Sequence, residues 1–219
     1  MLLAILVIAF AIAPVVLLAE AVAALLGRDR QAVVAWTSSM VMGLVILAVV
    51  WHFGLGRLQA LPRSLGMAKP RGSPVVVILL AVAALTGSLV LTGLYTILVR
   101  WLDAGLLTPP EIQGDIVFTG LASLMSFFAI AVWTPITEEI FFRGFIIAGL
   151  TPRLGPWWAM AVSAAIFSAF HLNLGVMVPI FATGLILALL YHRTGSLWPG
   201  IAAHVGQNTL ALLGAMYGV

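Results

Sequence analysis

Residues Thr137 to Arg143 read TEEIFFR, which places two adjacent carboxylates and an arginine inside a segment that is otherwise apolar from Ile116 to Leu150. Moving an ionised side chain into hydrocarbon costs several kcal/mol even after snorkelling and local entry of water, so such charges indicate chemistry or transport. Two more polar groups interrupt apolar surroundings downstream, FSAFH at 167–171 and HVGQN at 204–208. We expect the three groups to serve one function.

The composition predicts a membrane protein. Of 219 residues, 63% are hydrophobic and 8% are charged, whereas a soluble domain carries roughly 25% charged residues. The net charge of +3 comes from ten basic residues that fall mostly in loops, so it indicates membrane topology and not a nucleic-acid partner. The absence of cysteine excludes a disulfide framework, a thiolate metal site and a cysteine nucleophile.

The apolar runs predict an all-α fold, a polytopic transmembrane bundle of about seven helices that forms one domain over residues 1–219. Each run approaches or exceeds the roughly 20 residues that a membrane-spanning helix needs. We expect the first run to be retained as a helix, because no Lys or Arg precedes it and it is too long for a signal peptide. The expected helices are Leu2–Leu26, Val33–Leu55, Val75–Val99, Ile116–Leu150, Trp157–Leu172, Val176–Tyr191 and Leu197–Tyr217.

The loop charges predict the orientation in the membrane. Arg57, Arg63, Lys69 and Arg71 fall in one loop, whereas the segment 100–115 has three acidic residues against one Arg. Basic loops stay in the cytoplasm, so the amino terminus is expected to be cytoplasmic as well. Nine of the ten basic residues are Arg, a bias typical of GC-rich prokaryotic genomes, so we expect a prokaryotic cell membrane.

The paired glutamates predict two different roles. Glu139 and Arg143 are four residues apart and share a helix face, which favours an ion pair within the helix. Glu138 points about 100° away around the helix and is therefore the candidate general base, able to take a proton from water and return it to a leaving amine. Pro135, about one turn earlier, is expected to leave backbone carbonyls without donors and to open the helix there.

The other two polar groups add imidazoles and an amide. His171 lies four residues after Phe167, and Asn208 lies four after His204, so each pair shares a helix face. Either pair by itself is compatible with a polar clasp between helices. Together with Glu138, they supply a base, two imidazoles and an amide donor, a set that can activate water and hold an oxyanion.

The spacing between the groups predicts a helical hairpin. Glu138 lies 17 residues before Gly155 and His171 lies 16 residues after it, so two antiparallel helices would place both side chains at a similar depth. His204 follows the connection at 195–199 by only one or two turns. Its approach to His171 is expected to require a tilted or re-entrant segment.

In chain order, the motifs EExxxR at Glu138, FxxxH at Phe167 and HxxxN at His204 resemble the signature of the CPBP intramembrane proteases. This family includes type II CAAX prenyl endopeptidases and bacterial relatives linked to bacteriocin self-immunity and peptide processing. The run Tyr191–Ile201 also resembles the family's sequence before its last histidine. The resemblance covers residues 134–208.

The resemblance implies that Glu138 and His171 activate the attacking water, and that His204 and Asn208 stabilise the oxyanion. It also implies that Glu139 and Arg143 hold the helix in register. Family members have been described as metalloproteases as well, in which case a divalent ion such as Zn²⁺ would be bound by Glu138, His171 and His204.

The metal-free mechanism is favoured here, because asparagine is an unusual zinc ligand but a good oxyanion donor. The HExxH zinc motif is also missing from the sequence.

A cavity lined by aromatic side chains within the bilayer suits a substrate with a lipid or apolar tail, either a prenylated peptide or a hydrophobic peptide. The candidate lining residues are Phe141, Phe142, Phe145, Phe167 and Phe170.

Two other functions stay open. A proton-coupled transporter would also bury charges, but repeated halves with broken helices are typical of that class and are not visible here. A non-catalytic membrane immunity or scaffold protein would keep the polar groups as clasps between helices, and Glu138→Gln would then spare its function.

Overall fold

The computed structural model describes residues 1–55 and 65–217, and within these residues all regular structure is helical. Arg57 and Arg63 of the basic loop lie outside the described residues. Contacts divide the chain into two compact units: unit 1 comprises Met1–Ala60, Ile112–Phe141 and Val205–Val219, and unit 2 comprises Leu61–Glu111 and Phe142–His204. The units alternate along the sequence, and the single domain over 1–219 stays a prediction.

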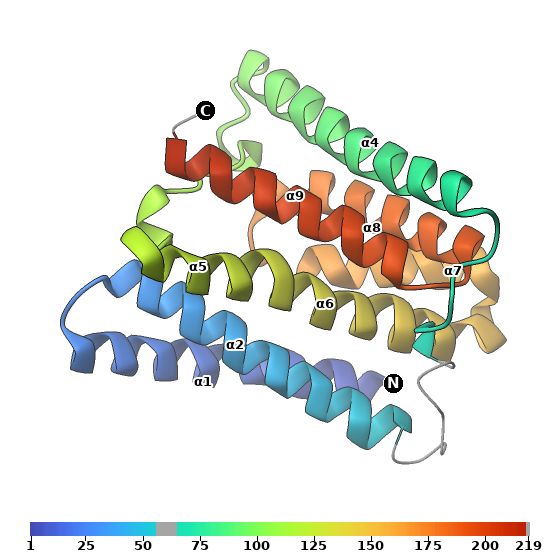
Figure 1. Cartoon of the computed structure of the whole chain (residues 1–219), viewed down its shortest axis with the longest axis horizontal. Coiled ribbons are helices and arrows are strands. Elements are labelled where there is room, and N and C mark those ends of the chain that lie inside the picture. The colour runs from blue at the N-terminus through green and yellow to red at the C-terminus, as the bar shows by residue number, and fades with distance from the viewer. Residues whose placement is uncertain (56–64, 218–219) are drawn as a thin grey trace. The chain divides into compact units, whose positions relative to one another are not determined.

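Unit 1 begins with a helical hairpin of α1 (Leu2–Leu26) and α2 (Arg30–Val50), which lie side by side (Figure 1). Helix α1 ends at Gly27, whose φ of 68° is left-handed and whose N–H donates to the carbonyl of Ala23. Small buried residues, Ala4, Ala19, Ala23 and Ala32 among them, allow the two backbones to approach closely, as in other membrane helix pairs. A π-helical segment, η1 (Trp51–Leu55), continues α2.

The second part of unit 1 is a row of short helical segments that packs against α2. The row comprises η4 (Gly114–Ile116), η5 (Gly120–Ala122), α5 (Ser123–Ser126), the π-helix η6 (Phe127–Trp133) and α6 (Thr134–Glu139). The indole Nε1–H of Trp133 donates to the carbonyl of Met40 over 3.3 Å. Gly43 leaves room for this indole, because a Cβ there would lie only 2.1 Å from Nε1.

Unit 2 is built around α8 (Leu174–Thr194), which packs against α4 (Pro74–Trp101) and α7 (Ala148–Ala169) (Figure 1). Helix α4 begins with Ser73, whose side chain accepts from the N–H of Val76, followed by proline at the first helical position. The unit also holds η3 (Gly105–Leu107), and the π-helix η7 (Ile140–Ile147) leads into α7. The last helix, α9 (Trp198–Tyr217), carries both His204 and Asn208.

The predicted hairpin about Gly155 is confirmed. Helix α7 is broken there, because Gly155 has non-helical dihedrals (φ 73°, ψ 165°) and is followed by Pro156. On the two arms, the rings of Phe142 and Phe167 lie 4.9 Å apart, and Ser163 donates to the carbonyl of Phe142 over 2.8 Å. The chain therefore reverses direction at the glycine and packs η7 against the second half of α7.

The prediction of a multi-pass helical membrane protein is also confirmed. Among the described residues, five helical stretches are long and apolar enough to cross a membrane. The stretch from Gly120 to Ala169 is long enough for two passes, one before the break and one after it. Helix α4 exposes many large apolar side chains, including Val75, Ile78 and Leu79. A surface of this kind requires lipid and not water as its solvent.

Candidate active site

The paired glutamates lie on α6, a short α-helical segment between the π-helices η6 and η7. Glu139 is fully buried, whereas Glu138 is partly exposed. The two carboxylates therefore have different surroundings, as their angular separation predicts. π-Helical turns are rare and occur frequently at functional sites; the sequence analysis predicted an opened helix beside Pro135 but not this geometry on both sides of the pair.

Arg143 is held by two contacts within unit 2. Its side chain is 1% exposed, and one terminal nitrogen donates to the carbonyl of Gly184 over 3.1 Å. The guanidinium carbon also lies 4.8 Å from the centroid of the Phe167 ring, a cation–π distance. Arg143 thus ties η7 to α8 and to the second half of α7, which is consistent with a role in holding this helix in place.

His171 and His204 both contact the ring of Phe167. The ring centroids of Phe167 and His171 are 5.0 Å apart, those of Phe167 and His204 are 5.9 Å apart, and both pairs meet edge to face. His204 is buried, and α9 is continuous around it. A break in α9 at His204 is therefore not needed for one phenyl ring to contact both imidazoles, and the tilted or re-entrant segment expected from the sequence stays a prediction.

The hydrogen bond of His171 fixes the tautomer of its neutral ring. Its Nδ1 lies 2.9 Å from the carbonyl oxygen of Phe167. A carbonyl can only accept, so Nδ1 carries the hydrogen, and Nε2 of the neutral imidazole holds the lone pair. The side chain is exposed. This arrangement suits a base that receives a proton at Nε2, and it equally suits a metal ligand.

Asn208 lies in unit 1 and donates from Nδ2 to the backbone carbonyl of Ile130 in η6, over 3.0 Å. The sequence analysis assigned this side chain only to the oxyanion. A carboxamide nitrogen carries two hydrogens, so this bond leaves the second hydrogen for another acceptor.

The phenylalanines predicted to contact substrate are mostly buried, and three of them are joined by ring contacts. Phe141, Phe142, Phe145 and Phe167 are buried, and the ring of Phe142 meets those of both Phe167 and Phe170. Aromatic contacts of this kind hold helices in register and position their neighbours. A role in binding substrate stays a prediction.

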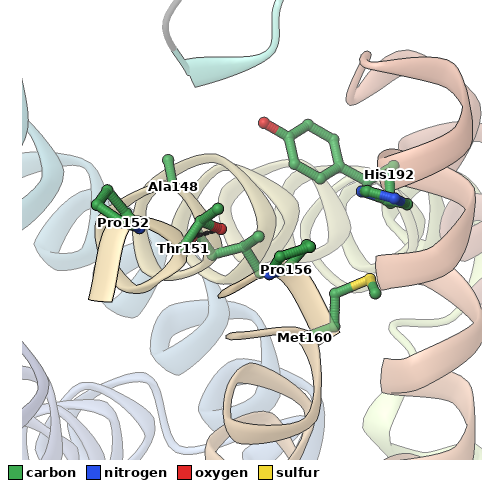
Figure 2. Close-up of a pocket in the computed structure, with 8 residues that line it drawn as sticks. Ala148, Thr151, Pro152, Pro156, Met160 and His192 are labelled. Carbon is green, nitrogen blue, oxygen red and sulfur yellow. Dashed lines mark hydrogen bonds between the residues drawn. The ribbon is translucent and has the colours of Figure 1, made fainter. Parts of the chain in front are cut away.

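A pocket of about 450 Å³ lies elsewhere in unit 2 (Figure 2). Pro156 is 15 residues from His171, about 22 Å at the rise of an α-helix, and neither His171 nor His204 lines the pocket. No sequence motif predicted this pocket, although two of its residues, Tyr191 and His192, begin the run that resembles the family. The pocket is lined by Ile147, Ala148, Thr151, Pro152, Pro156, Met160, Tyr191 and His192.

Comparison with known proteins gives two matches. Residues 120–210 match the family described as "Type II CAAX prenyl endopeptidase Rce1-like". The chain is also 35% identical over 79 residues to a Bacillus subtilis (strain 168) protein named "Putative membrane peptidase YdiL", a match that covers 36% of this chain and 32% of that protein. The match thus spans about a third of the relative's length. No solved structure gives a significant match.

The fold and the motifs define a multi-pass helical membrane protein with polar groups on three apolar segments. The matches confirm the resemblance to the CPBP intramembrane proteases over residues 120–210. All three motifs lie inside the matched segment.

Proposed function

We propose that this chain is an intramembrane endopeptidase that hydrolyses a peptide bond in a lipidated or hydrophobic peptide. The observation that carries the proposal is the contact of His171 and His204 with one phenyl ring, Phe167. Both histidines lie in the segment that matches the peptidase family. The two histidines come from distant parts of the chain and meet at one ring, which supports a shared function.

In the proposed reaction, Glu138 and His171 take a proton from water while the water oxygen attacks the carbonyl carbon of the substrate. The oxyanion that forms accepts hydrogen bonds from His204 and from the second N–H of Asn208. The carbon–nitrogen bond then breaks as the stored proton passes to the leaving amine. Glu139 and Arg143 hold the surrounding helix in place.

The metal-dependent alternative uses the same side chains. A divalent ion such as Zn²⁺ would be held by Glu138, His171 and His204, and the Nε2 lone pair of His171 fits this use. The ion would supply Lewis acidity to lower the pKa of water. The metal-free mechanism is proposed because Asn208, which donates through its amide in this structure, is suited to an oxyanion.

The proposed partners are the lipid bilayer and a hydrophobic peptide. Helices with large exposed apolar side chains place the chain in the bilayer, so a substrate that carries a prenyl group or an apolar segment arrives in the same phase. The family description names prenyl endopeptidases, which makes a peptide with a prenylated cysteine the first substrate to try.

The test is cleavage of a fluorogenic peptide with a prenylated cysteine by purified protein in proteoliposomes. Glu138→Gln, His171→Ala and His204→Ala should each lower kcat by about 100-fold or more, the usual contribution of acid–base groups. Thermal unfolding checks that each variant folds, and His52→Ala, an exposed histidine outside the motifs, should cleave as the wild type does.

Cleavage at the wild-type rate by Glu138→Gln would refute the catalytic role of Glu138, whereas no cleavage by the wild-type protein would refute the peptidase proposal and favour the immunity or scaffold function. The same assay decides the metal question. Activity that survives dialysis against a chelator supports the metal-free mechanism, whereas activity that is lost and then restored by Zn²⁺ replaces it with the metal-dependent one.

A further inference from the structure

The π-helix η6 leaves one backbone carbonyl without a backbone donor. The N–H of Thr134 donates to the carbonyl of Ala129, five residues earlier, which is the π-helical register. The Thr134 hydroxyl donates to the same carbonyl over 2.9 Å. In that register, the next carbonyl, that of Ile130, would receive the N–H of residue 135. Residue 135 is proline and has none.

Asn208 supplies the missing donor. Its Nδ2 lies 3.0 Å from the carbonyl oxygen of Ile130, although the two residues are 78 positions apart in the chain. A carbonyl that lacks both a donor and water costs about 1–3 kcal/mol, and the bilayer offers little water to the partly buried Ile130. The bond from Asn208 thus gives the Ile130 carbonyl a donor that Pro135 cannot supply.

A side chain also donates to a backbone carbonyl of the second π-helix. In η7, the carbonyl of Phe142 accepts from the hydroxyl of Ser163 over 2.8 Å. A serine hydroxyl has one hydrogen and uses it in this bond, whereas the asparagine nitrogen has two. Asn208 can thus satisfy the carbonyl and still donate elsewhere, and the first bond fixes the plane of its amide.

We propose that Pro135 and Asn208 form a positioning pair. The proline leaves the Ile130 carbonyl without a backbone donor, and this carbonyl then orients the Asn208 carboxamide. The hydrogen bond and its effect on stability do not depend on the catalytic assignment. Only the consequence for the reaction rests on the proposed function, since there the second N–H of Asn208 donates to the oxyanion.

The test is a double-mutant cycle on the purified protein with Asn208→Ala and Pro135→Ala. Asn208→Ala should lower the unfolding temperature, because it leaves the Ile130 carbonyl without a donor. In the Pro135→Ala background the backbone regains an N–H for this carbonyl, so the loss caused by Asn208→Ala should shrink by at least half. Asn208→Leu, which keeps the volume of the side chain, should behave in the same way.

The matched control is Pro179→Ala, which removes another buried proline from a helix interior. It should leave the effect of Asn208→Ala unchanged. Equal losses of unfolding temperature in the wild-type and Pro135→Ala backgrounds would overturn the pairing, whether or not the protein cleaves peptides.

The catalytic part is tested by kinetics of peptide cleavage. Pro135→Ala should lower kcat by about 10-fold with little change in KM, because a missing orientation acts on the transition state. In a chain that already carries Asn208→Ala, the same change should have no further effect on kcat. A Pro135→Ala variant with the wild-type kcat would overturn the positioning role even if the unfolding temperatures are coupled.

Discussion

At the scale of single residues, the site depends on Phe167, which contacts three of the motif side chains. Its ring meets His171 and His204 edge to face and lies under the guanidinium of Arg143. Such contacts are each worth about 0.5–1.5 kcal/mol beyond the burial of area. The residue also provides the carbonyl that fixes the tautomer of His171. The phenylalanine of the FxxxH motif therefore acts as the structural centre of the histidine pair.

Phe167→Leu should separate the loss of ring contacts from the loss of apolar bulk. We expect it to lower the free energy of unfolding by about 1–3 kcal/mol, because the aromatic contacts go while most of the apolar side chain remains. Its kcat for peptide cleavage should fall by about 10-fold, since neither imidazole keeps its edge-to-face partner.

The control is Phe10→Leu on α1, where the phenylalanine is 77% exposed. Its free energy of unfolding and its kcat should match those of the wild type. A Phe167→Leu variant with normal kcat would show that the ring does not position the histidines.

At the scale of elements, Gly184 allows α7 to pack closely against α8 beside Phe167. A Cβ at Gly184 would lie 3.0 Å from the Cβ of Ala164 and 3.2 Å from Cδ1 of Phe167. The carbonyl of the same glycine accepts the hydrogen bond of Arg143. One small residue therefore sets the distance between two helices and leaves its carbonyl within reach of the guanidinium.

Gly184→Ala should lower the free energy of unfolding by about 1–3 kcal/mol, the usual cost of overpacking a core. It should also lower the rate of cleavage, because the added methyl group displaces the Phe167 ring. Denaturant unfolding measures the first effect and the peptide assay the second.

Gly93→Ala in α4 is the matched control, because a Cβ there meets nothing within 4 Å. It should raise the free energy of unfolding by about 0.5–1 kcal/mol through the better helix propensity of alanine. If Gly184→Ala raised the free energy of unfolding by the same amount, the close contact of Gly184 with Ala164 and Phe167 would be refuted.

At the scale of the whole molecule, the long apolar helices and the loop charges determine how the chain meets the membrane. The five long apolar stretches carry few charges, and Lys69 and Glu111 lie in exposed connections on either side of α4. The positive-inside rule places the connection with Lys69 in the cytoplasm and the one with Glu111 outside. Because the chain has no cysteine, a single introduced cysteine can show on which side of the membrane a connection lies.

Glu111→Cys should react with a membrane-impermeant maleimide in intact bacterial cells, whereas Lys69→Cys should react only after permeabilisation. The cysteine-free wild type should stay unlabelled under both conditions. The reverse labelling pattern would place the amino terminus outside the cell and contradict the predicted orientation.

The sequence by itself determined the class of protein, the helical segments, the break at Gly155 and the three motifs. These features follow from spacing along the chain: a span is read from the length of an apolar run, the turn at Gly155 from its nearly equal distances to Glu138 and His171, and the motifs from a spacing of four residues on a helix. The fold class was therefore predicted correctly, and all three motifs lie in the segment that matches the family.

Tertiary structure alone decided how the side chains of those motifs are used. The approach of His204 to Phe167, the bond between Asn208 and Ile130, and the pocket beside Tyr191 each join residues distant in the chain. Which carbonyl lacks a donor, and which side chain replaces it, depends on the π-helical register of η6 and on the helix packed against it. Helical periodicity gives the face on which a side chain lies, but only packing determines what that face meets.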